Sequence, residues 1–401
     1  MSHLKSFMQD FSASALVTGL IAVIVSYAGP LVIVFQAAQG GHLTPAQLSS
    51  WIWAISIGSG ITGMYLSIRY RAPVITAWST PGAALLVTSL AQYSYAEAVG
   101  AYLFSALLIT LLGVTGLFSR IMERLPVGVI AAMLAGILFR FGIGVFSSLE
   151  QLPALVLPMV VVYLIGRRWW PRYAIVATLA VAFAVASGLG KLNFEHFSAS
   201  LAIPVWTSPQ LSLPAIIGLG IPLCFVTMAS QNAPGIAVLR TFGYATPINP
   251  LITTTGLVSL LLAPFGAHGI NLAAITAAIC TGEEAHPQAG RRYIAGVSCA
   301  AFYLLIGSFG ATIAGLFSSL PSALIASLAG LALFSSLANG LGLALSNERK
   351  REPALITFLV TASGVSFFGI GAAFWGLALG VAADWLLFGE LPWRRVVPAT
   401  R

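Results

Sequence analysis

Apolar runs long enough to cross a lipid bilayer recur along this chain, and they constrain its fold more than any other feature. Numbered as segments 1 to 14, they cover residues 13–38, 48–68, 73–92, 97–118, 127–147, 152–166, 173–190, 213–239, 248–264, 267–282, 292–317, 321–345, 354–370 and 371–388. A spanning helix needs about 20 apolar residues, so we expect the shorter segments to be tilted, re-entrant or broken. Charged residues make up only 7% of the chain, against about 25% in soluble domains. The sequence therefore predicts an all-α polytopic membrane protein with about 14 transmembrane segments.

The basic residues indicate how these segments are oriented. When the N-terminus is placed in the cytoplasm and the segments alternate, all of the 19 lysines and arginines except Arg140 and Lys191 fall on the cytoplasmic side. This is the pattern that the positive-inside rule requires. Both termini are then cytoplasmic, and residues 191–212 form an external connector. Topology thus explains the formal charge of +8, so we expect membrane lipid as the surrounding partner and no nucleic acid.

Two internal matches divide the chain into related halves. SYAGPLVIVFQ (26–36) aligns without gaps to SQNAPGIAVLR (230–240), and the pattern GLFS…LP…IA…LAG occurs at 116–136 and again at 315–330. The first half covers residues 1–190 and the second covers 213–401. Each half holds an odd number of segments, so the second copy must be inverted in the membrane. A 7+7 inverted repeat is typical of secondary transporters, whose substrate site lies near the bilayer midplane.

Equivalent breaks in segments 3 and 10 point to such a site. Ser79-Thr80-Pro81-Gly82 is typical of a helix cap followed by proline in the first turn, so a half-helix is predicted to begin inside the membrane. In segment 10 we expect a non-helical stretch at Gly266–Gly269 and a half-helix that begins at Gly269–Asn271. Two facing helix N-termini would bind an anion without lysine or arginine. The alternative is a pair of proline-kinked helices packed in the bundle.

Polar side chains near these breaks are the candidate ligands. Gln231 and Asn232 lie beside Pro234 in segment 8, and Tyr27 lies at the equivalent place in segment 1. Carboxamides in hydrocarbon need partners, which either a substrate cavity or a neighbouring helix supplies. His268 lies within the break of segment 10, where it is a candidate proton carrier or a histidine bonded to a nearby carbonyl.

Other polar groups receive a structural interpretation. Arg140 lies toward the outer end of segment 5 and Asp384 near the inner end of segment 14, so both are expected to be structural. The loop Thr281–Pro287 holds two glutamates and a histidine, but no second group has matching spacing, so we predict no metal site. No nucleophile and base have a usable spacing either. We therefore expect neither an enzyme nor a cofactor.

The motif NLAAITAAICTGEEAHPQAGRRY (271–293), supported by ASQNAPGIAVLR (229–240) and ITAWSTPGAALL (75–86), resembles the benzoate:proton symporter (BenE) family over essentially the whole chain. That family is related in fold to uracil permease and the nucleobase–ascorbate transporters. The resemblance implies a core domain (13–118 and 213–317) that moves against a gate domain (127–190 and 321–388). Nucleobase relatives use glutamates in segments 8 and 10, where this chain has only neutral side chains, and this favours an anionic substrate.

The predicted function is import of benzoate or a similar aromatic carboxylate with protons, across a bacterial inner membrane, by alternating access. Alternatives are a permease for another small organic anion or a nucleobase, or a passive anion channel. A homodimer is a further expectation. The predicted proton-coupling residue is His268. The predicted substrate-binding residues are Tyr27, Trp78, Ser79, Thr80, Gln231, Asn232, His268, Gly269, Ile270 and Asn271.

Overall fold

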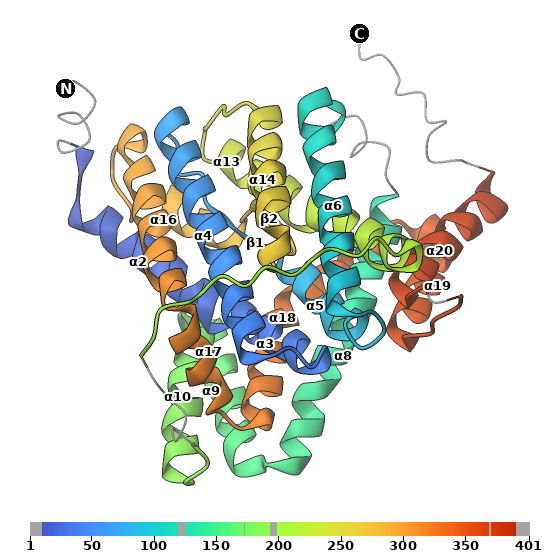
Figure 1. Ribbon diagram of the computed structural model, residues 1–401, viewed down its shortest axis with the longest axis horizontal. Helices are drawn as coiled ribbons and strands as arrows, with labels where there is room; N and C mark the ends of the chain where they lie inside the picture. The colour runs from blue at the N-terminus through green and yellow to red at the C-terminus, as the bar shows by residue number, and fades with distance from the viewer. Residues whose placement is uncertain (1–9, 119–125, 172, 193–198, 369, 390–401) are drawn as a thin grey trace.

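The computed structural model describes residues 10–118, 126–171, 173–192, 199–368 and 370–389. Within them the chain is mostly helical, with one two-stranded sheet (Figure 1). Seven helical spans are long and apolar enough to cross a membrane, or up to eight if a pair bent by 71° counts as one span. Leucines such as Leu164, Leu261 and Leu386 are 60–73% exposed, as side chains that face lipid would be. The described part of the chain is thus a helical membrane protein.

Helices and strands occupy all the predicted apolar segments. The first half contains α2 (Ala13–Ala28), α3 (Pro30–Gly40), α4 (Pro45–Tyr70), β1 (Thr76–Trp78), α5 (Thr80–Ser89), α6 (Tyr95–Thr115), α8 (Val127–Gln151), α9 (Pro153–Trp169) and α10 (Ala174–Gly188). The second half contains α11 (Leu213–Ala215), η1 (Ile216–Gly220), α12 (Ile221–Thr227), η2 (Met228–Asn232), α13 (Ala233–Thr241), α14 (Ile248–Leu262), η3 (Ala263–Phe265), β2 (Ile270–Leu272), α15 (Ile275–Thr281), η4 (Ala289–Arg291), α16 (Tyr293–Ser308), α17 (Gly310–Ser318), α18 (Ser322–Ala344), η5 (Glu348–Lys350), α19 (Arg351–Ser363) and α20 (Ala372–Phe388). The number of membrane crossings and the inverted repeat stay predictions.

Segments 1 and 8 are interrupted beside their equivalent prolines. Helix α2 ends before Gly29, and Pro30 starts α3, because proline lacks the N–H that would continue the ladder. In segment 8, Pro234 lies in the first turn of α13, directly after the π-helix η2. A π-helix leaves the regular i to i+4 bonding and often marks a functional position. Gln231 and Asn232 both lie in this irregular turn.

The short strands β1 and β2 lie side by side, β1 against α4 and β2 against α14. They pair antiparallel, with Thr76 opposite Leu272, Ala77 opposite Asn271 and Trp78 opposite Ile270. The helix that precedes each strand also holds it. The Thr76 hydroxyl donates to the Ser59 carbonyl of α4 (2.7 Å), and the Ile270 N–H donates to Ser259 Oγ of α14 (2.7 Å). These bonds satisfy polar backbone and side-chain groups, for which lipid offers no hydrogen-bond partner.

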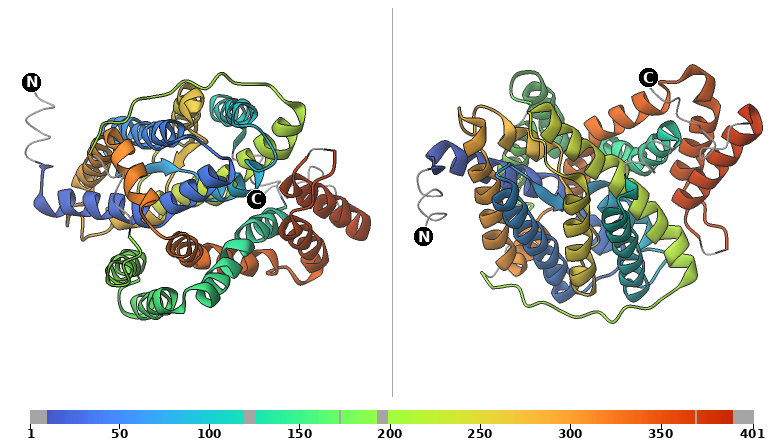
Figure 2. Two further views of the ribbon diagram at one scale, coloured as in Figure 1. Left: turned by 60° about the horizontal axis from the view of Figure 1, so that its bottom comes forward. Right: turned by 90° about the horizontal axis from the view of Figure 1, so that it is seen from above.

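The helices form two groups, which Figure 2 (left) shows as two layers. One group surrounds the strand pair and contains α2, α4, α6, α14 and α16; the other contains α8, α9, α10, α18, α19 and α20. Small residues allow close packing within each group. A Cβ added at Gly19 of α2 would lie 2.6 Å from the Cys299 N of α16, and one at Gly330 of α18 would lie 2.3 Å from the Phe141 O of α8. Such contacts are typical of membrane helix pairs.

The described part of the connector, residues 199–212, has no helix or strand and runs along one edge of the molecule (Figure 2, right). Residues 193–198 of the connector lie outside the described residues. The Val205 N–H donates to Ser50 Oγ near the start of α4 (2.9 Å), and the Ala202 N–H donates to the Ser308 carbonyl at the end of α16 (2.8 Å). The connector therefore covers one end of the first helix group.

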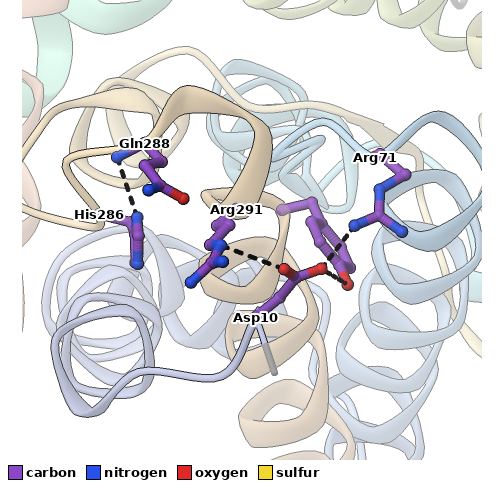
Figure 3. A network of polar contacts seen from close by, with 6 residues as sticks. Asp10, Arg71, His286, Gln288 and Arg291 are labelled. Carbon is purple, nitrogen blue, oxygen red and sulfur yellow. Dashed lines mark hydrogen bonds and ion pairs between the residues drawn. The ribbon is translucent and has the colours of Figure 1, made fainter. Parts of the chain in front are cut away.

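A charged network marks the opposite ends of these same helices (Figure 3). Asp10 pairs with Arg71, which follows α4, at 2.5 Å, and with Arg291, which precedes α16, at 3.2 Å. The Tyr293 hydroxyl donates to the same carboxylate (3.0 Å). Basic residues at one end and the connector at the other agree with the predicted sidedness. Which end faces the cytoplasm stays a prediction.

Candidate functional site

Ser79 begins helix α5 in the interior of the first helix group. Its Oγ accepts a hydrogen bond from the Gly82 N–H at 3.1 Å, and Pro81 lies in the first turn. The sequence expectation of a capped half-helix at this point is confirmed. The Thr227 hydroxyl of α12 donates to the same Ser79 oxygen at 3.0 Å, so segments 3 and 8 are joined here. Ser79 is fully buried, and Thr80 is half-buried.

The predicted start of the second half-helix is wrong. Residues Ile270–Leu272 form strand β2, and helix α15 begins only at Ile275. The backbone bends at Gly266 (φ 107°) and Gly269 (φ 153°), a region that glycine adopts readily, and the chain then pairs with β1. Because the strands are antiparallel, α5 and α15 begin at opposite ends of a pair about 10 Å long. The two helix starts therefore lie at opposite ends of the strand pair.

Gly269 and Asn271 instead lie beside the start of α5. The Ser79 N–H donates to the Gly269 carbonyl at 3.0 Å. With its carboxamide turned so that both of its ends are satisfied, Asn271 Oδ1 accepts from the same N–H at 2.8 Å, and its Nδ2 donates to the Leu272 carbonyl at 3.0 Å. Ile270 is fully buried opposite Trp78. The residues predicted for two helix starts thus gather around one.

His268 has a hydrogen-bond partner on each ring nitrogen. The Trp51 indole N–H donates to Nδ1 at 2.9 Å, and Nε2 lies 3.0 Å from the Ser79 carbonyl oxygen. An indole nitrogen can only donate and a carbonyl oxygen can only accept. Nδ1 is therefore unprotonated and Nε2 carries the proton, which makes the ring neutral. In this state His268 connects α4 to the start of α5.

Gln231 and Asn232 are neighbours in sequence but have different surroundings. Asn232 is fully buried; its Oδ1 accepts from the Leu272 N–H at 2.9 Å, and its Nδ2 donates to Met228 Sδ at 3.2 Å. Asn232 thus holds strand β2 in place. Gln231 is half-buried, and its carboxamide has no hydrogen-bond partner among the described residues. It is therefore the carboxamide that can bind a ligand.

Tyr27, Trp78 and Tyr303 form an aromatic cluster from three different segments. The Tyr27 ring lies edge-on to Trp78, with centroids 5.5 Å apart, and 6.0 Å from Tyr303. The Tyr27 hydroxyl is hydrogen-bonded to Ser56 Oγ. Trp78 Nε1 is buried without a partner among the described residues, and the Tyr303 hydroxyl lies beside Ser26. Buried polar groups are usually paired, so the Trp78 donor can accommodate a ligand with an acceptor oxygen.

Sequence reasoning missed Trp51, Thr227 and Tyr303. Each lies within a long apolar segment, where a tryptophan or tyrosine is commonly an interface anchor and a threonine commonly bonds its own helix. Figure 1 shows that α4, α16 and the strands are side by side, but this proximity leaves no local pattern in the sequence. The internal match between 116–136 and 315–330 covers only the ends of segments 4 and 11 and does not reach Tyr303.

A cavity lies where the ends of α3 and α5 meet the second helix group. It has a volume of about 420 Å³, and residues of α3, α5, α8, α18 and α20 line it. None of the predicted site residues lines it. Arg140 does, and its guanidinium donates to the Ala362 carbonyl (3.2 Å) and the Ser363 carbonyl (2.9 Å) at the end of α19. Arg140 therefore has the structural contacts that were expected, and it also lines a cavity.

Asp384 and the loop Thr281–Pro287 have structural contacts. Asp384 is buried and lies 2.9 Å from Lys350 Nζ. Arg292 donates to the carbonyls of Thr281 (2.8 Å) and His286 (2.7 Å), and so holds the predicted polar loop. The described residues contain no cluster of acidic, histidine or cysteine side chains that could hold a metal ion.

Comparison with solved structures shows the fold class. The chain resembles SLC26A9 with a TM-score of 0.63 at 15% identity, over 95% of this chain and 66% of that one. It resembles the transmembrane domain of the cyanobacterial bicarbonate transporter BicA with a TM-score of 0.56 at 16% identity, over 94% of this chain and 96% of that one. The chain thus spans about two thirds of SLC26A9 and nearly all of the BicA domain. This likeness shows a transporter-like fold.

Comparison with known sequences shows the family. The chain is 45% identical to a benzoate membrane transport protein of Acinetobacter baylyi (strain ATCC 33305 / BD413 / ADP1), over 96% of this chain and 98% of that protein. It is 44% identical to the inner membrane protein YdcO of Escherichia coli (strain K12), over 91% of this chain and 93% of that protein. The family model described as benzoate membrane transport protein (BenE) matches residues 9–386. The chain therefore belongs to the BenE family of membrane transport proteins, not to a family of enzymes.

Proposed function

We propose that this protein imports benzoate or a similar aromatic carboxylate together with protons, by alternating access across a bacterial inner membrane. The name of the 45% identical relative supports the substrate, and that of the relative from Escherichia coli supports the inner membrane. The single observation that carries the proposal is the aromatic cluster of Tyr27, Trp78 and Tyr303, in which Trp78 Nε1 is a buried donor without a partner among the described residues. Aromatic walls with a free buried donor suit an aromatic ring that bears a carboxylate.

The proposed binding site joins this cluster to the start of α5. The helix N-terminus and its N–H groups favour negative charge, and Ser79, Thr80, Gly269 and Asn271 surround it. Gln231, with its free carboxamide, would orient the substrate, and Tyr27 would pack on the ring. The fully bonded Asn232 and Ile270 would shape the site through the position of β2.

His268 holds the start of α5 in position. Its bonds to Trp51 and to the Ser79 carbonyl favour a positioning role, because protonation of Nδ1 requires the loss of the Trp51 bond. His268 stays the candidate for proton coupling that the sequence offers. The two roles are separable by experiment, as set out in the Discussion.

Alternating access needs two bodies that move relative to each other. We propose that the helix group around the strands is the core domain, 13–118 and 213–317, and that the second group is the gate domain, 127–190 and 321–388. Fourteen segments in a 7+7 inverted repeat, both termini in the cytoplasm and the connector outside complete the proposal. Two observations support this arrangement. Each strand is held by the helix that precedes it, and the connector and the basic network lie at opposite ends of the helices.

Proton coupling follows from the charge of the substrate. Import of an anion against a negative-inside potential costs about 2.3 kcal/mol per charge per 100 mV. One proton per carboxylate removes that cost, and a second would gain from the potential. The alternatives are a permease for another small organic anion or a nucleobase, or a passive anion channel. One fold relative is a bicarbonate transporter, so transport of another small organic anion is the stronger alternative.

The donors of the aromatic cluster give the test. In proteoliposomes, Trp78→Phe and Tyr303→Phe should each raise the KM for radiolabelled benzoate about tenfold, the change expected for one hydrogen bond to a charged group. Tyr163→Phe, in the gate domain, is the matched control and should leave the KM unchanged. A KM unchanged in both cluster variants would refute the proposed site. Competition by a nucleobase but not by benzoate would refute the proposed substrate.

A further inference from the structure

Arg140 lines the 420 Å³ cavity, and no other described residue of its lining is charged. Polar side chains Gln36, Thr88 and Gln92 line the same cavity from α3, α5 and the turn after α5, and Ile137 and Phe141 of α8 form an apolar wall. The volume falls within the range of about 300–1,000 Å³ that small-molecule sites have. The lining thus combines one cation, hydrogen-bonding groups and an aromatic surface.

Arg140 retains hydrogen-bonding capacity toward this cavity. A guanidinium has five N–H donors, and two hydrogen bonds, to Ala362 and Ser363, hold Arg140 at the end of α19. No carboxylate pairs with Arg140 among the described residues. Its charge is therefore fixed in position by neutral carbonyls and left uncompensated, an arrangement that suits recognition of an anion.

The cavity lies at the same end of the molecule as the connector. Gln36 precedes the turn into α4, whose Ser50 bonds the connector, and Gln92 precedes α6. The Gln210 N–H of the connector donates to the Ala96 carbonyl at the start of α6 (3.0 Å). The network of Asp10, Arg71 and Arg291 lies at the other end (Figure 3). On the predicted topology, the cavity lies toward the external side.

We propose that Arg140, with the polar groups of this cavity, forms an external capture site for aromatic carboxylates. The nature of the ligand rests on the proposed function. The guanidinium binds the carboxylate, and the ring lies against Ile137 and Phe141. Helix α5 forms one wall of the cavity and begins at Ser79, so the captured anion lies at the opposite end of the helix whose start belongs to the transport site. A fixed charge in a partly enclosed cavity also raises the local anion concentration and the rate of encounter.

The test removes the positive charge at position 140 and then places one at position 92, on another wall of the cavity. Right-side-out membrane vesicles report the KM for external benzoate, and inverted vesicles report the KM from the other face. Arg140→Gln should raise the external KM about tenfold, as for one lost hydrogen bond to a charged group, while Vmax and the internal KM stay unchanged. The double variant R140Q/Q92K should restore the external KM, because the positive charge then comes from the opposite wall. The external KM of the wild type should also rise with salt, and that of R140Q should not.

Each other result overturns the proposal. An unchanged external KM, an equal rise on both faces or failure of the double variant to restore binding would mean that Arg140 serves only α19. If Arg140→Gln does not fold, Gln92→Glu leaves the α19 contacts intact and should still raise the external KM; an unchanged KM would then refute the site. If the wild type takes up no benzoate, the proposed function fails. Equal binding of radiolabelled benzoate to purified wild type and R140Q would then overturn the capture site separately.

Discussion

Two adjacent carboxamides give the sharpest test of how this site is built. Gln231 and Asn232 are both in the π-helix η2, and sequence patterns treat them alike. In the structure, Asn232 bonds the Leu272 N–H of β2 and the Met228 sulfur, and Gln231 is half-buried and has no partner among the described residues. We predict that Asn232→Ala chiefly affects stability, and that Gln231→Ala affects transport alone.

The magnitude follows from the bonds that each change removes. Asn232→Ala leaves the N–H of Leu272, a residue only 1% exposed, without a partner. An unpaired buried donor costs about 1–3 kcal/mol, and no water is available in the bilayer core to reduce that cost. Gln231→Ala breaks no hydrogen bond within the described residues, so the expected change in the free energy of unfolding is close to zero. Its expected effect on the KM for benzoate is about tenfold, for one lost hydrogen bond to a charged group.

Thermal unfolding in detergent and benzoate uptake in proteoliposomes measure the two quantities on the same preparations. Asn232→Ala should lower the melting temperature, and Gln231→Ala should melt like the wild type but take up benzoate with a raised KM. The reasoning is refuted if Gln231→Ala melts as early as Asn232→Ala, or if Gln231→Ala transports normally.

Three further predictions follow from individual contacts. Ser79→Ala removes the cap of α5 and should lower the free energy of unfolding by about 1 kcal/mol. Thr227→Val removes only the bond to Ser79 Oγ and should lower it by less. Equal melting temperatures of Ser79→Ala and the wild type would contradict the role of Ser79 as a cap. His268→Gln keeps an acceptor and a donor but cannot titrate, so proton-driven uptake should persist; loss of uphill uptake with intact benzoate counterflow would instead assign the proton to His268. Lys350→Met leaves the buried Asp384 unpaired and should cost about 3–5 kcal/mol, and the double variant with Asp384→Leu should recover stability, as melting temperatures would show.

Most of the helices were predictable from sequence. Apolar length and the prolines located the helices, and Ser79-Thr80-Pro81 located the start of α5, because these signals are local. The start of α15 was misplaced because Gly269 and Asn271 also suit a helix cap. What decides their conformation is the pairing of β2 with β1, almost 200 residues earlier in the chain, and no local pattern encodes that partner.

The grouping of some candidate residues was predictable from sequence, but their individual contacts were not. The sequence correctly brought Ser79, His268 and Asn271 together. The sequence could not show that the Asn232 carboxamide oxygen already accepts a hydrogen bond from the Leu272 N–H, since that bond depends on how segment 8 packs on segment 10. Trp51 and Tyr303 were missed for the same reason: their importance comes from the neighbours that packing gives them. Arg140 was expected to be structural, and its cavity depends on how the two helix groups meet.

The central claim is that this protein accumulates an aromatic carboxylate at the expense of a proton gradient. The most direct measurement is uptake of radiolabelled benzoate into proteoliposomes with an imposed inward proton gradient. We predict accumulation above the external concentration, abolished by a protonophore. Uptake that stops at equal concentrations would indicate a passive channel, and accumulation of another solute in place of benzoate would contradict the proposed substrate.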